Sequence, residues 1–401
     1  MDRERISSAL ARALDLARRT TRFPAEIFWE PTLPPDGLDE LEECLRDQED
    51  LRIFENRELW FFSIGCGNVN HRDLALWLTA RAFRLHSQLK DDVSAVEDTV
   101  ENLHQFLGTT TIPILTVAAV SGVTPESPIS LSDQLTLLRF DGLPPSRMRR
   151  DRLSVLGSLA PRPEAALMKG ELLTRTGEEA GNRKVTYHRD DSEFREACRI
   201  ITIVGICAPR ILSIWEQTED WVPCGDRLYR SHILWGGHPF PYRTEILSDE
   251  KGRLVRALWD RYASVPEPTK RTLRMSIDRL NLALGNMIIS NSAIELGISL
   301  EALLLADRQP DRGEQTLTLR LRAARLLGSD VDSRRQVSLL IRNVYAIRSQ
   351  AVHTGTVDID KPMNGEPKLS LLSRGHWVAA EANRKIIEAG ALPDWETLLY
   401  E

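Results

Sequence analysis

An arginine and a histidine near the end of one amphipathic stretch are the residues best suited to chemistry. The apolar face before them consists of Val337, Leu340, Ile341, Val344 and Ile347. Arg348 falls within this face, where a charge needs a partner or a purpose. Cleaving RNA without a metal requires one proton to leave the ribose 2′-OH and another to reach the leaving oxygen, which suits a histidine such as His353. The transition state concentrates charge on phosphoryl oxygens, which suits a guanidinium.

The spacing of this pair limits how it could act. Five residues on a straight helix amount to about 500° of rotation, so the two side chains diverge by about 140°. Either the helix end unwinds near His353, or a second subunit completes the site. The alternative interpretation is structural. Arg348 and His353 would then be last-turn residues that complement the helix dipole before the helix stops at Gly355.

The other histidines and cysteines do not have the spacing of a metal site or a disulfide framework. His232 and His238 lie in a loop rich in aromatic residues, glycine and proline, and Cys224 could in principle join them. A metal site needs three or four correctly spaced ligands, so we predict neither a metal nor another cofactor. The five cysteines are scattered and form no C-x-x-C pair. This pattern favours free thiols in a reducing, cytoplasmic environment.

The elements that must position Arg348 and His353 are helices. The sequence predicts them over 250–263, 269–306, 313–327, 332–353 and 376–389. Most connections between them are short, which favours antiparallel neighbours in a bundle. A chain of 401 residues suggests two or three domains, and we place a boundary between residues 264 and 265.

The first 264 residues have a mixed pattern. Helical spacing is found over 6–18, 70–89 and 93–107, and strand patterns are found over 51–64, 114–120 and 129–140. The apolar segment 193–214 could form a helix, a strand, or both in sequence. The predicted fold class is therefore α+β, with a mixed α/β region over 1–264 and an all-helical domain over 265–401.

The charge balance argues against a nucleic-acid binder when averaged over the chain, because the net charge is −6. Arginines nevertheless gather on two successive predicted helices: Arg320, Arg322, Arg325, Arg334, Arg335, Arg342 and Arg348. Arg334, Arg335 and Arg342 are the candidate RNA contacts, because each could neutralise a phosphate. The alternative is a set of surface arginines paired with acidic residues. No apolar run is long enough to span a bilayer, so we expect no membrane association.

A resemblance gives the arginine–histidine pair a specific context. The segment Arg348-Ser-Gln-Ala-Val-His353 resembles the R-x4–6-H motif of HEPN (higher eukaryotes and prokaryotes nucleotide-binding) domains. Residues 339–345 lead into it within a helical region. Upstream, the apolar helix over 293–305 resembles the "Glu-Ala-Leu" helix of ApeA-like HEPN domains. The resemblance covers about residues 265–390.

The resemblance implies a metal-independent endoribonuclease that forms a homodimer through its HEPN domain. His353 would act as general base or acid on the 2′-OH, and Arg348 would hold the scissile phosphate. Many family members are anti-phage defence or toxin effectors that cut tRNA or other RNA. Residues 1–264 would then sense a phage or host trigger, hold the nuclease inactive, or bind a partner.

Ser349 and the acidic overall charge keep a second hypothesis open. Many active members have Asn, Asp or His after the motif arginine, whereas this chain has Ser349, which is a weaker orienting group. Glu301 either supports the site from the neighbouring helix or is a polar residue at the rim of the bundle. Because some HEPN domains have lost catalysis, the alternative is a non-catalytic dimerisation or interaction protein.

Overall fold

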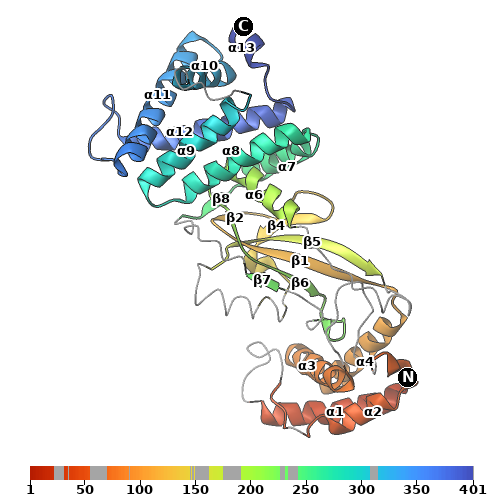
Figure 1. The fold of residues 1–401 in the computed structure, drawn as a ribbon. Coiled ribbons are helices and arrows are strands. Elements are labelled where there is room, and N and C mark those ends of the chain that lie inside the picture. The colour runs from red at the N-terminus through yellow and green to blue at the C-terminus, as the bar shows by residue number, and fades with distance from the viewer. Residues whose placement is uncertain are drawn as a thin grey trace.

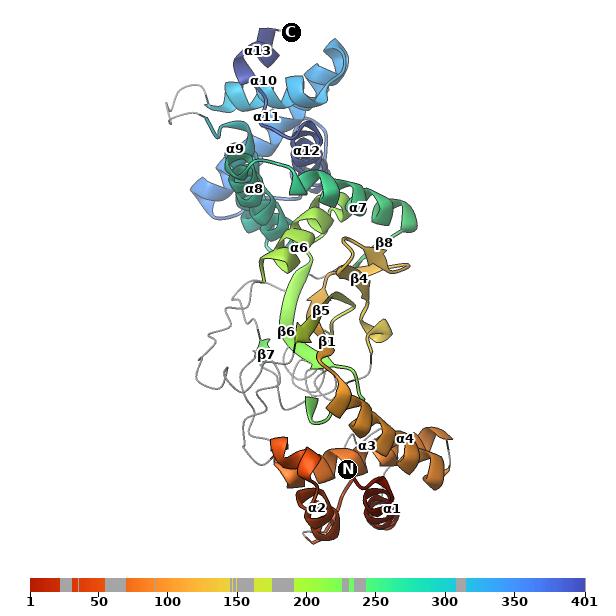
Figure 2. The same ribbon diagram turned by 90° about the vertical axis from the view of Figure 1, so that its right-hand side faces the viewer.

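A computed structural model shows an elongated α+β molecule. It describes residues 1–21, 31–34, 36–54, 70–89, 91–144, 146, 149, 162–174, 191–225, 231–233, 243–307 and 315–400. A group of N-terminal helices, a sheet and a group of C-terminal helices follow one another along its length (Figure 1). Figure 2 shows the same order after a quarter turn, with helix α6 between the sheet and the C-terminal helices. The predicted fold class is confirmed.

The N-terminal group has its own apolar core. Its elements are α1 (Arg3–Thr20), α2 (Asp39–Arg46), the 3-10 helix η1 (Glu49–Phe54), α3 (His71–Leu89) and α4 (Asp92–Gly108). Asp2 and Asp91 cap α1 and α4, because their carboxylates accept backbone N–H groups that a helix start leaves unpaired. The helices predicted over 6–18, 70–89 and 93–107 are confirmed.

The strand pair predicted over 51–64 is wrong where it can be checked. Residues 51–54 belong to η1, and residues 55–64 lie outside the described part of the chain. Leu51 and Phe54 are fully buried. A 3-10 helix has three residues per turn and therefore brings residues with this spacing to the same side. Burial of both side chains against the N-terminal core explains the helical turn.

The sheet has the strand order β3-β4-β5-β1-β6-β7. The strands are β1 (Thr111–Ser121), β3 (Ile129–Ser130), β4 (Leu135–Arg139), β5 (Ala165–Thr174), β6 (Arg210–Thr218) and β7 (Ser231–Ile233). A short parallel pair is formed by β2 (Val123–Pro125) and β8 (Glu245–Leu247), and a 3-10 helix η2 spans Phe140–Gly142. The strand predicted over 114–120 is confirmed as β1. The single strand predicted over 129–140 is two short antiparallel strands, β3 and β4, joined by residues 131–134 and followed by η2.

Strand β1 is buried on both faces. It pairs antiparallel with β5 on one side and β6 on the other. Ala118 and Val120 belong to the large core that includes α6 and the C-terminal helices. Val117 and Ala119 point the other way and join a smaller cluster that contains Trp215. Burial on both sides accounts for the continuous apolar run in the sequence of this strand.

The C-terminal group is helical throughout. Its helices are α6 (Ser192–Gly205), α7 (Asp249–Ala263), α8 (Glu267–Gly285), α9 (Ile289–Leu304), α10 (Gln315–Leu327), α11 (Val331–Thr354), α12 (Lys368–Ala389) and α13 (Trp395–Tyr400). The segment 193–214 is both helix and strand in sequence, because α6 is followed by β6. Among the described residues, no helix has an apolar stretch long enough to cross a membrane.

Two predicted helix boundaries need correction. The helix predicted over 269–306 is two helices, α8 and α9, with a corner at Asn286. The Asn286 side chain accepts the N–H of Ile288 at 3.1 Å and stabilises this corner. The apolar pattern hid the break because it continues through Met287 and Ile288, which are exposed. The helix predicted over 376–389 begins earlier, at Lys368, directly after Pro367.

One apolar core runs from the sheet into the C-terminal helices. Helix α6 contacts α7, α8 and α12. Polar contacts reinforce this packing, because Glu196 of α6 accepts hydrogen bonds from Tyr262 at 2.7 Å and Arg274 at 2.5 Å. The boundary at 264/265 stays a prediction, and residues on both of its sides contribute to this core.

Candidate functional site

Helix α11 carries both motif residues and is well defined at its two ends. Asp330 caps its start in a reciprocal arrangement with Ser333. Gly355 ends it in the left-handed conformation, with φ of +71°. The helix continues through Thr354, so it does not unwind near His353. The expectation of an unwound helix end is therefore wrong, and a site completed by a second subunit stays a prediction.

Arg348 lies against α9. Its Nη2 is 3.4 Å from Oε1 of Glu301, and its guanidinium carbon is 5.3 Å from the centre of the Tyr345 ring. The Tyr345 hydroxyl donates a hydrogen bond to Glu301. Burial and this hydrogen bond raise the pKa of Tyr345. Because 27% of the Arg348 side chain is exposed, the guanidinium is oriented by its neighbours and still reaches solvent.

Gly297 makes this approach possible. A Cβ at this position would lie 2.7 Å from Cγ of Arg348, closer than real side chains come. The absence of a side chain on α9 therefore gives Arg348 its path between the two helices. Glu301 follows one turn later on the same helix, where its carboxylate meets the guanidinium.

His353 lies on a different side of α11. Exposed and half-buried side chains recur along this side, and we call them the α11 stripe: Arg335, Leu339, Arg342, Ala346, Ser349 and His353. At 100° per residue, these side chains fall within about 80° around the helix, whereas Arg348 is about 140° from His353. Within one chain, the two motif residues therefore face different surroundings.

The candidate RNA-contacting arginines differ in their surroundings. Arg342 is exposed on the stripe. Arg335 is also exposed and has a long ion pair with Asp332, at 3.5 Å. Arg334 is half-buried, and its Nε donates to the Gly328 carbonyl at 3.2 Å. Arg342 and Arg335 can therefore reach a ligand more freely than Arg334.

Two arginines of α10 form more hydrogen bonds within the described part of the protein than Arg335 and Arg342 do. Arg322 is 3% exposed and donates to Asp307 at 2.6 Å and to the Leu304 carbonyl at 2.7 Å. Arg320 is half-buried and donates to Ser338 of α11 at 3.2 Å. Arg322 has an acidic partner, as the structural alternative expected, but it is buried rather than on the surface.

The segment after α11 folds back on that helix. Asn364 donates to the side chain of Asn343 at 2.9 Å. Lys368, which is 4% exposed, donates to Gln350 at 3.0 Å and to the Asp358 carbonyl at 2.7 Å. These bonds hold the last turns of α11 and therefore help to fix the position of His353.

Sequence reasoning missed Tyr345 and Gly297. Tyr345 precedes Arg348 by three residues, a spacing that places two side chains side by side on a helix. A glycine inside an apolar helix signals close packing, and Gly297 has this position in the predicted helix. Glu301 contacts Arg348, and the roles of Glu301, Arg348, His353 and Ser349 stay predictions.

No protein-family model, curated protein or solved structure matches this chain. The described residues also contain no cluster of three or more His, Cys, Asp or Glu side chains that could hold a metal ion. His238 lies outside the described residues. The HEPN resemblance therefore rests on the residues of α9 and α11 themselves.

Proposed function

We propose that this protein is a metal-independent, HEPN-type endoribonuclease that acts as a homodimer through its helical region. One observation carries the proposal. Glu301 of α9 and Tyr345 of α11 hold Arg348 in place, and α11 exposes His353 on a side that also bears Arg342. A catalytic pair needs one oriented group for the phosphate and one accessible group for proton transfer.

A second copy would complete the site. In a twofold-symmetric dimer, the same surface of each copy meets itself. The α11 stripe suits such a contact, because Leu339 is 45% exposed and Ala346 is small. Packing of two α11 helices through the stripe would bring His353 and Arg342 of both copies to one seam. Because Arg348 is about 140° from His353 on each helix, the contact would have to extend past the stripe, over the exposed Val352, to include the two arginines.

The proposed reaction starts at the ribose 2′-OH. His353 would take the 2′-OH proton as the oxygen attacks the adjacent phosphorus, and a histidine would give a proton to the departing 5′ oxygen. Arg348 would donate hydrogen bonds to the phosphoryl oxygens as charge develops on them. The products would be a 2′,3′-cyclic phosphate and a 5′-hydroxyl. Ser349 would be an auxiliary hydrogen-bonding group beside this site.

The proposed setting is defence against phage, or a toxin that cuts tRNA or other RNA in the cytoplasm. The N-terminal helices and the sheet would sense a phage or host trigger. The continuous core between the sheet and the C-terminal helices supports this arrangement. Helix α6 contacts both α8 and α12, so a movement of α6 would reach the C-terminal helices directly.

The test is cleavage of total tRNA by the purified full chain in EDTA. We expect fragments with 2′,3′-cyclic phosphate ends, and a rate at least about 100-fold lower for His353→Ala. His104→Ala is the matched control, because His104 is an exposed histidine on α4, and it should cleave like the wild type. Intact tRNA in all reactions, or full activity of His353→Ala, would rule out the proposal.

A second candidate is a non-catalytic interaction protein that uses the α11 stripe as its dimer surface. The ion pair between Glu301 and Arg348 favours it, because a carboxylate already pairs with one nitrogen of the guanidinium. Expression in growing cells separates the two candidates. Toxicity that His353→Ala removes supports the nuclease, whereas an effect that survives both His353→Ala and Arg348→Ala supports the interaction protein.

A further inference from the structure

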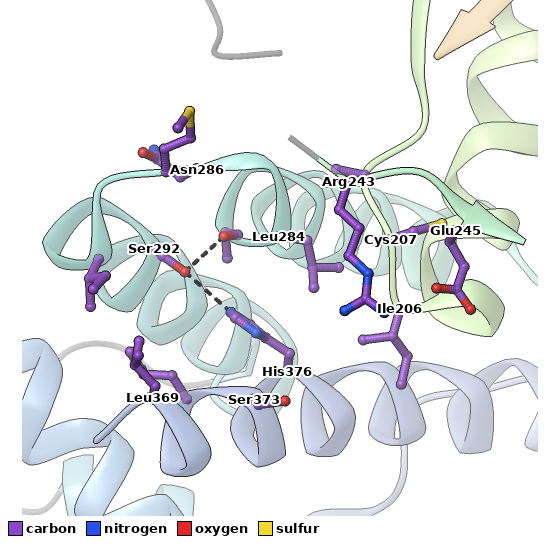
Figure 3. A pocket seen from close by; sticks show the side chains of 15 residues that line it. Ile206, Cys207, Arg243, Glu245, Leu284, Asn286, Ser292, Leu369, Ser373 and His376 are labelled. Carbon is purple, nitrogen blue, oxygen red and sulfur yellow. Dashed lines mark hydrogen bonds between the residues drawn. The ribbon is translucent and has the colours of Figure 1, made fainter. Parts of the chain in front are cut away.

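A cavity of about 570 Å³ lies between the corner of α8 and α9, helix α12 and the segment that leads into β8. Figure 3 shows the side chains that line it. Leu284, Ile289 and Leu372 supply apolar wall, and Ile206 closes the side next to the sheet. The volume is within the range of small-molecule sites, which combine apolar walls with a few polar groups. None of these residues belongs to the α11 site.

Arg243 brings a positive charge to this cavity. Its side chain reaches inward from the segment before β8 (Figure 3). Glu245 also lines the cavity, but its carboxylate accepts a hydrogen bond from Lys251 at 2.6 Å. Lys251, which does not line the cavity, therefore balances the charge of Glu245. No carboxylate of the described residues forms an ion pair with Arg243. The charge balance of the cavity thus favours an anionic group near Arg243.

His376 presents a hydrogen-bond acceptor from the opposite wall. The single hydroxyl proton of Ser292 is donated to the Ala283 carbonyl at 2.8 Å. Ser292 Oγ can therefore only accept from Nε2 of His376, which is 3.4 Å away, as the dashed lines in Figure 3 show. This assigns the ring proton to Nε2 and leaves Nδ1 as an acceptor. Burial lowers the pKa of His376 to about 4, so the ring is neutral at pH 7.

We propose that this cavity binds a small organic anion with a flat apolar body and one N–H or O–H donor. The anionic group would pair with Arg243, the donor would bond to His376, and the body would lie against Leu284 and Leu372. The proposal does not depend on the nuclease activity. Because Arg243 comes from the sheet side and His376 from α12, such a ligand would bridge two layers of the molecule.

Two related fluorescent probes test this proposal on the full chain. 8-Anilinonaphthalene-1-sulfonate has an anionic group, an N–H donor and an aromatic body. N-phenyl-1-naphthylamine has the same body and donor without the sulfonate. We expect the sulfonate probe to bind once per chain. Arg243→Gln should weaken it about tenfold, and should change the affinity for the neutral probe by less than about twofold.

Matched variants distinguish the cavity from other apolar surfaces. Arg253→Gln removes an exposed arginine of α7 and should leave both affinities unchanged. Ser373→Trp and Leu369→Trp each place a bulky ring at an exposed position that lines the cavity, and both should abolish binding while far-UV circular dichroism stays unchanged. Absent binding, equal weakening in the two arginine variants, or binding that survives both tryptophan variants would overturn the proposal.

Discussion

Arg322 and Arg348 have the same two kinds of neighbour, but their contacts with them differ. Each guanidinium lies near a carboxylate and an aromatic ring. Arg322 donates to Asp307 at 2.6 and 2.9 Å, donates to a backbone carbonyl, and lies 4.8 Å from the Trp395 ring. Its side chain is 4% exposed. Arg348 has one ion pair at 3.4 Å, a ring at 5.3 Å, and an exposure of 27%.

The difference shows what separates an arginine that holds helices together from one that can receive a ligand. The donors of Arg322 are largely used by Asp307 and Leu304, so it ties the end of α9 to α10. Arg348 is oriented with fewer of its donors engaged. A guanidinium has five N–H donors in a planar fork, and those not engaged by the protein can bind phosphoryl oxygens. Residue type and charge are the same in both places, and the local packing decides the role.

The largest expected effect is on the free energy of unfolding of Arg322→Met. This variant removes the hydrogen bonds that Arg322 donates to Asp307 and to the Leu304 carbonyl, and should lower the free energy by about 3 kcal/mol. Arg348→Met removes a partly exposed ion pair and should cost about 1 kcal/mol. Urea unfolding followed by circular dichroism measures both. Equal losses, or the reverse order, would contradict the comparison.

The second prediction concerns His376, whose burial favours the neutral form of the ring. Its pKa falls from 6.5 to about 4 on folding. Between these values the unfolded state binds more protons, so stability decreases as the pH falls through this range. The expected loss between pH 7 and pH 5 is about 2 kcal/mol. Unfolding of His376→Gln should lack this loss, whereas His104→Gln should retain it. Identical pH profiles for all three proteins would contradict the assignment.

The smallest expected change in stability is that of Gly297→Ala. The new Cβ must displace Arg348, but alanine favours a helix over glycine by up to about 1 kcal/mol. We therefore expect a net change within about 1 kcal/mol and a loss of RNA cleavage similar to that of Arg348→Met. Gly108→Ala, where the added Cβ meets no heavy atom within 4 Å, should cleave normally. Full cleavage by Gly297→Ala would mean that the placement of Arg348 does not matter.

Local periodicity was enough to predict most of the described helices, because their apolar faces repeat along the sequence, and a β-branched apolar run predicted the central strand β1. Its neighbour β5 was not predicted. It failed at the corner between α8 and α9, where Met287 and Ile288 continue the apolar pattern while exposed to solvent. Helix geometry alone predicted that Arg348 and His353 diverge. The partners of Arg348 were harder to predict, because Glu301 and Gly297 reach it through the packing of α9 on α11 rather than through spacing along one helix.

The packing of α6 limits where the chain could be cut into fragments or joined to a different N-terminal region. Its buried residues, such as Ile200 and Ile201, belong to the core shared by the sheet and the C-terminal helices. A fragment that begins at residue 265 would expose the apolar surface that α6 covers on α8 and α12, and would be prone to aggregate. A fragment that ends before α6 would expose the face of the sheet. A chimera with a new N-terminal region should therefore retain α6 and α7 with the helices and present to α6 a sheet face of the same shape.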